Sequence, residues 1–294
     1  AEFMRTLGIL VNTQKPLAIQ KAKHILSWGK TRGIQLLLPP HEASVLGVEG
    51  VSDEIWRTTV EAGIVIGGDG TFLRASRYVL DYGVPLYGIN LGNMGFLASG
   101  KPEEFESDLE RILSGLFEIE PHHVLEGTVW REDLRLHTMF ALNDLVVSKG
   151  AFARLVTIEI RFASEFVSHI AADGIIVATP TGSTAYALSA GGPIVPPHVP
   201  CMVIAPICAH TLYTRPVIAG EQDVISLIPR GSPRDVMLTQ DGQLGYELLP
   251  GDRIEVSLSK DKHVRMIVLP HRRFFSLVQE KFRWGAGAVL YEKE

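Results

Sequence analysis

Strand-like and helix-like segments alternate through the first 115 residues, and this alternation restricts the fold more than any other feature of the chain. Apolar residues spaced with a helical period predict helices at 16–32, closed by Gly33, and at 71–83, closed by Gly83. Strands separated by helices need right-handed crossovers, so we expect a parallel, Rossmann-like sheet. The apolar runs that predict its strands are LGILVN at 7–12, IQLLLP at 34–39, AGIVIG at 62–67 and VPLYGIN at 84–90.

The pattern changes after one further amphipathic helix, which PEEFESDLERILSG predicts at 102–115. The later segments GTVWRE, LRLHTMFALNDLVVS, LVTIEIRF, DVISLIP and DRIEVSLSK are short, rich in β-branched residues and separated by turn residues, which is typical of a β-rich, sandwich-like domain. Helical spacing returns between Phe274 and Trp284. We therefore expect an α/β domain at 4–118, a β-rich domain at 119–270 and a helical tail at 271–294 that packs back on the first domain.

Charge and composition argue against several classes of protein. The 294 residues carry 28 basic and 33 acidic side chains, and this net charge of −5 argues against a nucleic-acid partner. No run approaches the roughly 18 apolar residues of a membrane span and no signal-peptide pattern is present, so we expect no membrane partner and a cytoplasmic location. The two cysteines, Cys201 and Cys208, are too few for a disulfide framework or a complete zinc site.

The third expected strand runs directly into three glycines around one carboxylate, GGDGT at 67–71. Glycine tolerates a positive φ and has no Cβ, so such a turn suits a place where the backbone approaches a ligand closely. Backbone amides of Gly68 and Gly70, together with the start of the next helix, would then form a nest for phosphate oxygens. The alternative is a tight strand-to-helix turn capped by Asp69.

A second polar cluster lies in DGIIVATPTGSTAYALSAGGPIVPP, from Asp173 to Pro197. Hydroxyl groups and bare amides follow a short strand there, and Tyr186 adds a flat aromatic ring. This combination suits a nucleotide, whose base stacks on a ring while its ribose or phosphate forms hydrogen bonds. The alternative is a Ser/Thr helix cap with Tyr186 in the core.

An amide and a carboxylate, Asn143 and Asp144, interrupt the apolar segment LNDLVVSKG. Burial of a carboxylate without a partner is costly, so Asp144 requires one. The pair is either a bulge in a strand or a ligand contact.

Taken in order, these segments resemble the NAD kinase family. The resemblance rests on GGDGT, NLGNMGFLA at 90–98, LNDLVVSKG at 142–150, the run that contains TPTGSTAY, and QDGQ at 240–243. It implies phosphorylation of the 2′-hydroxyl on the adenosine ribose of NAD, which gives NADP. It also implies ATP or polyphosphate as phosphoryl donor, a divalent cation such as Mg²⁺, and a homodimer or homotetramer.

Site residues follow from the resemblance position by position. Asp69 corresponds to the catalytic carboxylate, and the amides of Gly68, Gly70, Gly92 and Gly95 to a cradle for donor phosphates. The nucleotide pocket would contain Phe96, Asn143, Asp144, Asp173, Thr181, Thr184, Ala185, Tyr186 and Ser189. Two positions depart from the family pattern, because Asp144 stands where Glu is more common and Ala171 where some relatives have Arg. No metal ligand can be assigned in this way.

Two other functions are compatible with parts of this pattern. GGDGT occurs in a wider kinase superfamily, so a lipid kinase of the diacylglycerol or sphingosine type is one alternative. The polar TPTGSTAY segment and the lack of a basic amphipathic helix disfavour it. A dinucleotide-binding regulator without catalysis is the other, and the presence of Asp69 argues against it. Among further charged groups, Arg74 and Arg77 are either phosphate contacts or solvated helix residues, and His169 and His210 are left out of the catalytic set.

Overall fold

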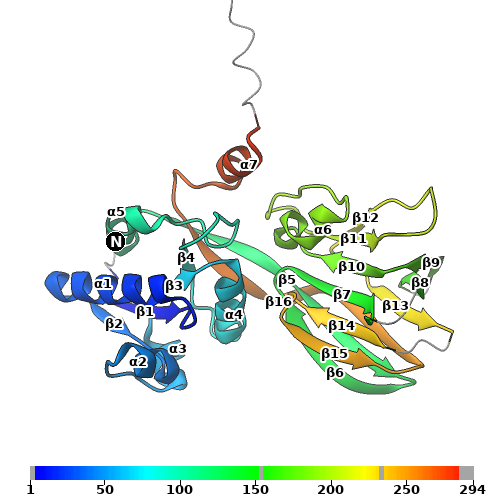
Figure 1. Cartoon of the computed structure of the whole chain (residues 1–294), viewed down its shortest axis with the longest axis horizontal. Coiled ribbons are helices and arrows are strands. Elements are labelled where there is room, and N and C mark those ends of the chain that lie inside the picture. Colours follow the sequence, from blue (N-terminus) through cyan, green and yellow to red (C-terminus); the bar gives the residue numbers. More distant parts are fainter. Residues whose placement is uncertain (1–3, 152–154, 164, 232–234, 285–294) are drawn as a thin grey trace, which may run out of the picture. The chain divides into compact units, whose positions relative to one another are not determined.

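The computed structural model describes residues 4–151, 155–163, 165–231 and 235–284 and divides into two compact units (Figure 1). Unit 1 is Ala1–Pro121 with Val264–Glu294, and unit 2 is His122–His263. The chain passes from unit 1 to unit 2 within strand β5 (Glu118–Arg131) and returns within β16 (Asp252–Val268). The unit boundaries therefore fall inside two long strands, a few residues from the limits expected at 118 and 270. Residues 285–294 of the expected tail lie outside the described residues.

Unit 1 is built on a parallel sheet with strand order β2-β1-β3-β4-β16. Its inner strands β1, β3 and β4 are almost entirely buried, as expected when helices cover both faces, whereas the edge strand β2 is partly exposed. The predicted parallel sheet is confirmed. Besides the end of β16, the sheet contains β1 (Thr6–Val11), β2 (Gln35–Leu37), β3 (Ala62–Gly67) and β4 (Leu86–Asn90).

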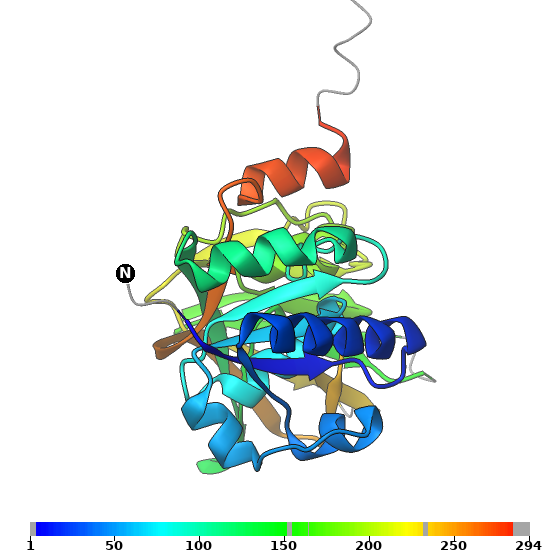
Figure 2. The same ribbon diagram turned by 90° about the vertical axis from the view of Figure 1, so that its left-hand side faces the viewer.

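Helices cover this sheet, with α1 and α5 on one side and α2 and α3 on the other (Figure 2). Pro16 begins α1 and Gly33, at φ 66°, ends it, so both limits are those predicted. Two short helices, α2 and α3, were not predicted. The helices of unit 1 are α1 (Pro16–Arg32), α2 (Pro40–Leu46), α3 (Asp53–Thr59), α4 (Asp69–Val79), the 3₁₀ turn η1 (Pro102–Glu104), α5 (Phe105–Leu113) and α7 (Phe274–Phe282).

The C-terminal helix α7 packs on unit 1, as predicted for the tail. The ring of Phe96 lies between those of Phe274 and Phe282, with ring centroids 6.0 and 5.7 Å apart. Lys101 forms an ion pair with Glu280 of the helix, at 3.3 Å. The loop after β4 and the end of the chain are thus held together by aromatic and ionic contacts.

Unit 2 is a β-sandwich, which confirms the predicted β-rich domain. One sheet is antiparallel with order β12-β11-β10-β7-β14-β15, and the other joins β16, β13, β8 and β9, with the hairpin β5–β6 beside β16. Inward-facing apolar side chains of both sheets form one core, including Ile158, Val177 and Leu238. The strands not bounded above are β6 (Leu134–Ala141), β7 (Asp144–Lys149), β8 (Val156–Phe162), β9 (Glu165–Ala172), β10 (Gly174–Ala178), β11 (Cys201–Ile207), β12 (Val217–Gly220), β13 (Ile225–Arg230), β14 (Val236–Gln240) and β15 (Leu244–Leu248).

The segment after β10 folds over the outer face of the six-stranded sheet. It contains the 3₁₀ turn η2 (Thr181–Thr184) and the short helix α6 (Tyr186–Ser189). Ala187 and Val195 of this segment pack on Val146, Ile176 and Val203 of the sheet. The polar cluster predicted from TPTGSTAY therefore rests on a rigid apolar base. Cys201 is buried in β11 and Cys208 is exposed, and both are free thiols. None of the helices in the described part of the chain has the length and apolar character that a membrane crossing needs.

Candidate active site

Asp69 lies at the edge of the unit 1 sheet where β3 and β4 end. It is the first residue of α4, which begins two residues earlier than the sequence predicted, so the carboxylate belongs to the first helical turn. A cavity of about 550 Å³ opens in front of it. The residues that line this cavity are Asn12, Lys15, Gly67, Gly68, Asp69, Gly70, Thr71, Asn90, Gly92, Asn93, Met94, Gly95 and Lys281.

The loop after β4 holds the Asp69 carboxylate in place. The amide of Ala98 donates to Oδ1 at 3.0 Å, and amides of Leu97 and Phe96 also interact with the carboxylate. Gly95 allows this approach, because a Cβ at that position would lie 2.0 Å from the same oxygen. Burial raises the pKa of Asp69, while these amides and the Lys281 ammonium act in the opposite direction.

The glycines around Asp69 are suited to their positions because they lack a Cβ, which lets other atoms approach closely, and not because they adopt a left-handed backbone conformation. None of Gly67, Gly68, Gly70, Gly92 and Gly95 is among the described glycines with positive φ. A Cβ on Gly67 would lie 2.5 Å from Thr71 Oγ1, whereas at Gly68 the nearest atom would be 3.9 Å away. Gly67 is thus required by packing, and Gly68 leaves bare backbone facing the cavity.

Two lysines that the sequence did not single out also line the cavity. Lys15 follows β1 and donates from Nζ to the Leu91 carbonyl at 2.9 Å. Lys281 comes from α7, with its Nζ 4.8 Å from the centroid of the Phe96 ring. Nothing in the local sequence of either lysine marks it, because the fold alone brings residues 15, 69 and 281 together. Their two positive charges suit phosphate oxygens.

Arg74 does not line the Asp69 cavity, although it lies on the same helix. Its Nη2 donates to the Val11 carbonyl at 3.0 Å, and its Nη1 lies 3.7 Å from Glu42. The interpretation of Arg74 as a contact for phosphate in that cavity therefore finds no support.

In unit 2 the Asn143–Asp144 pair and the hydroxyl-rich segment are adjacent. Strands β7 and β10 pair directly, with Asp144 opposite Ala178, and the Thr179 amide donates to the Asn143 carbonyl at 2.9 Å. Gly182 makes this contact possible, because a Cβ there would lie 1.9 Å from the same carbonyl oxygen. Two predicted clusters that are separated by about 35 residues thus form one surface.

Several of the predicted hydroxyls are engaged inside the loop. Thr179 donates to the Leu142 carbonyl, and Ser183 donates to Pro180 and accepts from the Val195 amide. Thr181 is buried, with its Oγ1 2.6 Å from Nδ1 of His122. Thr179 and Ser183 therefore stabilise the loop itself, but neither η2 nor α6 has a side-chain cap among the described residues, so the alternative of a Ser/Thr helix cap is not borne out. For Tyr186 the core alternative is wrong, because its side chain is 47% exposed.

Asp144 is a buried carboxylate for which no hydrogen-bond donor is found among the described residues. Burial, and then the charge of Asp241, raise its pKa to about 7. Asp241, which the sequence analysis did not place in the site, accepts the amides of Leu142, Asn143 and Asp144 at 3.1, 2.7 and 3.1 Å. With the backbone amides bound to Asp241, the Asp144 carboxylate remains a hydrogen-bond acceptor that a donor group of a ligand would satisfy.

The other predicted site residues differ in exposure and contacts. Asp173 forms an ion pair with Lys149 at 3.2 Å, Ser189 is exposed, and Thr184 and Ala185 are half-buried. Phe96, expected in the nucleotide pocket, lies in unit 1 with its ring in the aromatic cluster of α7.

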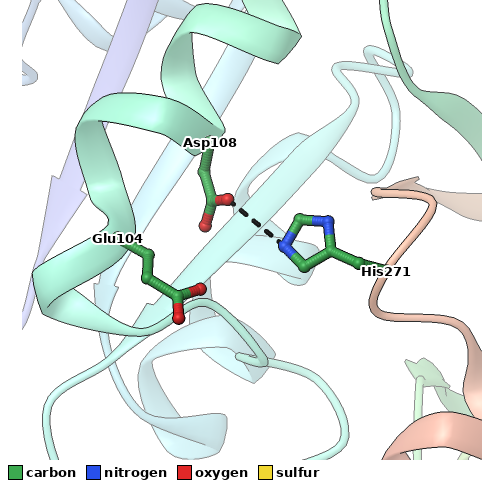
Figure 3. Close-up of side chains that lie close together, drawn as sticks. All are labelled: Glu104, Asp108 and His271. Carbon is green, nitrogen blue, oxygen red and sulfur yellow. Dashed lines mark ion pairs between the residues drawn. The ribbon is translucent and has the colours of Figure 1, made fainter.

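A group with metal-ligand chemistry lies elsewhere in unit 1 and is better explained as an ion-pair cluster. Glu104, Asp108 and His271 bring their ligand atoms within 4.8 Å of one another (Figure 3). Arg272 already occupies this group, with Nη1 3.1 Å from Asp108 and Nη2 bonded to Glu104. A guanidinium in this place repels a cation, so these residues do not form a convincing metal site.

Comparison with known proteins decides between the kinase families. The model of the ATP-NAD kinase N-terminal domain matches residues 7–117, and that of the C-terminal domain matches residues 142–269. The chain belongs to the NAD kinase family. The family resemblance inferred from GGDGT and TPTGSTAY is confirmed, and the lipid-kinase alternative is not supported.

Individual NAD kinases extend the match over nearly the whole chain. An NAD kinase of Moorella thermoacetica is 42% identical over 287 residues, which are 97% of this chain and 91% of that protein. An NAD kinase of Archaeoglobus fulgidus, solved with ATP, is 26% identical with a TM-score of 0.74, over 94% of this chain and 99% of that one. A yeast NADH kinase solved with NADH has the same fold, with a TM-score of 0.88 at 22% identity over 99% and 91% of the two chains.

The environment of Asp144 predicts how stability depends on pH. With a folded-state pKa of about 7, the folded protein binds more protons than the unfolded chain between about pH 4 and pH 7, so the free energy of unfolding falls as pH rises through this window. Asp144→Asn should remove this contribution, which we expect to be about 3 to 4 kcal/mol over the window. Urea unfolding at both ends of the window measures it, with the exposed Asp133→Asn as control. Equal pH slopes in wild type and Asp144→Asn would contradict the assignment.

Proposed function

We propose that this protein transfers the γ-phosphoryl group of ATP to the 2′-hydroxyl on the adenosine ribose of NAD, with Asp69 as the catalytic carboxylate. The observation that carries the proposal is the position of Asp69. It starts a helix, it is oriented by backbone amides, and it faces a cavity walled by glycines and two lysines. This arrangement combines a base with a phosphate site.

The donor phosphates would lie against bare backbone and positive charge. Amides at Gly68 and Gly70 and in the segment Gly92–Gly95 line the cavity with Lys15 and Lys281. An extended polyphosphate presents the same oxygens as ATP, so either donor fits this chemistry. The adenosine part of ATP has no counterpart in polyphosphate, and ATP is the donor that the family description supports.

A divalent cation also fits this cavity. Of the described residues that line it, Asp69 is the one carboxylate, and Asn12 and Asn93 carry amide oxygens, whereas the Asn90 amide is engaged within the loop after β4. Mg²⁺ commonly takes one or two carboxylates and completes its shell with water and substrate phosphate oxygens, which matches this set. Bound there, Mg²⁺ would neutralise charge that develops on the transferred phosphoryl group.

Asp69 would act on the acceptor hydroxyl. Its carboxylate would accept the hydroxyl proton, or a hydrogen bond from it, and align the oxygen with the phosphorus. Since such transition states are loose, alignment and charge neutralisation contribute most, and the base about 10²- to 10⁴-fold. The amides of Ala98, Leu97 and Phe96 orient the carboxylate for this role.

The NAD acceptor would contact the surface formed in unit 2. Asp144 offers a buried acceptor for an N–H or O–H of the adenosine moiety, and the exposed ring of Tyr186 offers a stacking face. Asn143, Asp173, Thr181, Thr184, Ala185 and Ser189 belong to or border the same surface, and we assign Phe96 to the site on family resemblance alone. Catalysis requires that this surface and Asp69 act on one NAD molecule.

Asp69→Asn should abolish most turnover while the protein stays folded and binds NAD. The amide keeps the shape of the side chain but cannot accept the proton, so kcat should fall by about 10²-fold or more. Formation of NADP from NAD, ATP and Mg²⁺ is measured with a coupled dehydrogenase, and omission of Mg²⁺ tests the cation. Asp133→Asn serves as the matched control because Asp133 is exposed. An unchanged rate would remove Asp69 from the mechanism and leave a non-catalytic role for the site.

Tyr186→Ala should weaken NAD binding more than it lowers stability. The ring is 47% exposed, so its loss removes little packing, whereas a stacking contact with a base contributes about 1 kcal/mol. Titration calorimetry with NAD and urea unfolding together measure the two effects. Tyr186→Phe, which keeps the ring, should bind NAD nearly as wild type does. A loss of stability without a loss of affinity would contradict the proposal.

We also propose a homodimer or homotetramer and a cytoplasmic location. Unit 2 exposes a group of large apolar side chains, of which Leu212 and Tyr213 are 85% and 92% exposed and Val217 and Ile218 about half. Such a patch is unusual for a free surface and favours a self-association interface. Leu212→Asp combined with Tyr213→Asp should lower the mass found by sedimentation. A wild-type monomer at all concentrations would rule the oligomer out.

A further inference from the structure

Unit 1 contains a second cavity that shares no lining residue with the cavity of Asp69. Its volume is about 250 Å³, and it lies between the end of β1, the start of α2, the start of α3 and the middle of α4. The residues that line it are Leu10, Pro39, Pro40, His41, Glu42, Asp53, Arg74, Ala75 and Tyr78. None of them is among the residues assigned above to catalysis or to the nucleotide pocket.

The cavity combines an apolar wall with one buried carboxyl group. Leu10, Pro39 and Ala75 are buried, and Pro40 and the ring of Tyr78 continue the same wall. Glu42 is only 4% exposed, and within the described residues no group donates a hydrogen bond to its carboxylate. Its charge partner is Arg74 at 3.7 Å, which is longer than a hydrogen bond.

Three of the polar side chains around the cavity are engaged with other protein groups through at least one atom. Tyr78 donates its hydroxyl to Asp53 Oδ1 at 2.7 Å, and Arg74 donates from Nη2 to the Val11 carbonyl at 3.0 Å. Nε2 of His41 lies 3.2 Å from Thr13 Oγ1. The acceptor oxygens that the cavity offers to an occupant come from Glu42 inside and from Asp53 beside it, with Nη1 of Arg74 near Glu42.

The charged groups of the cavity favour the same kind of occupant as its acceptor oxygens do. Among the residues that line the cavity, two carboxylates, Glu42 and Asp53, face one guanidinium, Arg74. A second guanidinium, Arg57, lies behind the wall, over the Tyr78 ring at 4.7 Å. Burial raises the pKa of Glu42 to about 7, with Arg74 lowering it and Asp53 raising it. An uncompensated carboxyl group of this kind is costly to keep, and a cationic donor would relieve the cost.

We propose that this cavity is a binding site for a small aromatic or heteroaromatic cation, such as a single-ring amidine or amino-substituted base. Its N–H groups would donate to Glu42, and its ring would lie against Pro39, Pro40 and Tyr78. A volume of about 250 Å³ is below the range for drug-sized ligands and suits one ring with its polar group. The occupant would contact α4, the helix that begins with Asp69. The site does not depend on the proposed NAD kinase activity.

Benzamidine and benzamide provide a matched pair of probes, because they share a ring and a planar group and differ in charge. We expect calorimetry at about pH 8 to show benzamidine binding at least about tenfold more tightly than benzamide. Glu42→Gln should remove this preference, and Glu49→Gln, at an exposed position, should retain it. Equal affinity for the two probes, or an unchanged preference in Glu42→Gln, would overturn the proposal.

Two further measurements guard against a folding effect of the variant. In wild-type protein with labelled methyl groups, benzamidine should shift the Ala75 and Leu10 signals, and shifts confined to other methyls would place the probe elsewhere and refute the site. Lowering the pH from about 8 to 6 should weaken benzamidine binding about tenfold, because the probe needs Glu42 ionised. Arg74, Asp53, Tyr78 and His41 also face this region, so the loss must disappear in Glu42→Gln but persist in His41→Asn.

Discussion

The hydrogen bond from the Ala98 amide to Asp69 joins two strand ends of unit 1 and fixes the geometry of its site. Strands β3 and β4 pair up to Gly67 and Asn90, and beyond this point the chain would separate without further contacts. Asn90 turns the following loop back, since its side chain donates to the Asn93 and Ala98 carbonyls and accepts from the Gly92 amide. The carboxylate is therefore oriented before any substrate arrives, which is how an active site avoids reorganisation during the reaction.

Unit 2 contains two neighbouring carboxylates, Asp241 and Asp144, which have different roles. Asp241 is saturated by three backbone amides and fixes the turn that presents Asn143 and Asp144. Asp144, beside it, is buried with no hydrogen-bond donor among the described residues, and burial, followed by the charge of Asp241, raises its pKa. Asp241 thus stabilises the turn, whereas Asp144 is an acceptor that a donor group of a ligand would satisfy. Natural proteins retain such destabilising groups where binding requires them.

The sequence predicted the parallel sheet, the β-rich unit and the family, because these depend on long apolar periods and on dense local motifs. It missed α2 and α3, which are seven residues each and too short for a clear helical period. It expected α4 to begin at Thr71, since glycines disfavour helix, but the contacts of Asp69 with the loop after β4 outweigh that preference. The apolar segment at 134–148 is two strands, and the polar pair Asn143–Asp144, interpreted as a bulge in one strand or a ligand contact, lies where the second strand begins.

Contacts between distant segments explain the remaining differences in the site. Lys15 and Lys281 reach one cavity only through the fold, and Asp241 acts on residues almost one hundred positions earlier. Hydroxyl density in TPTGSTAY correctly marked an unusual loop. It did not distinguish the hydroxyls that hold the loop together, such as Ser183, from side chains that face outward, such as Tyr186.

The path of the chain through β5 and β16 has a consequence for biosynthesis. All of unit 2 lies between two segments of unit 1, and the end of β16 that pairs with β4, together with helix α7, is encoded after residue 263. During translation the residues of the β-sandwich therefore emerge from the ribosome before the last strand of the unit 1 sheet is complete. During that interval the edge of β4 and the aromatic ring of Phe96 lack their final partners. The growing chain therefore exposes an unpaired strand edge and an apolar ring, which are features that chaperones bind.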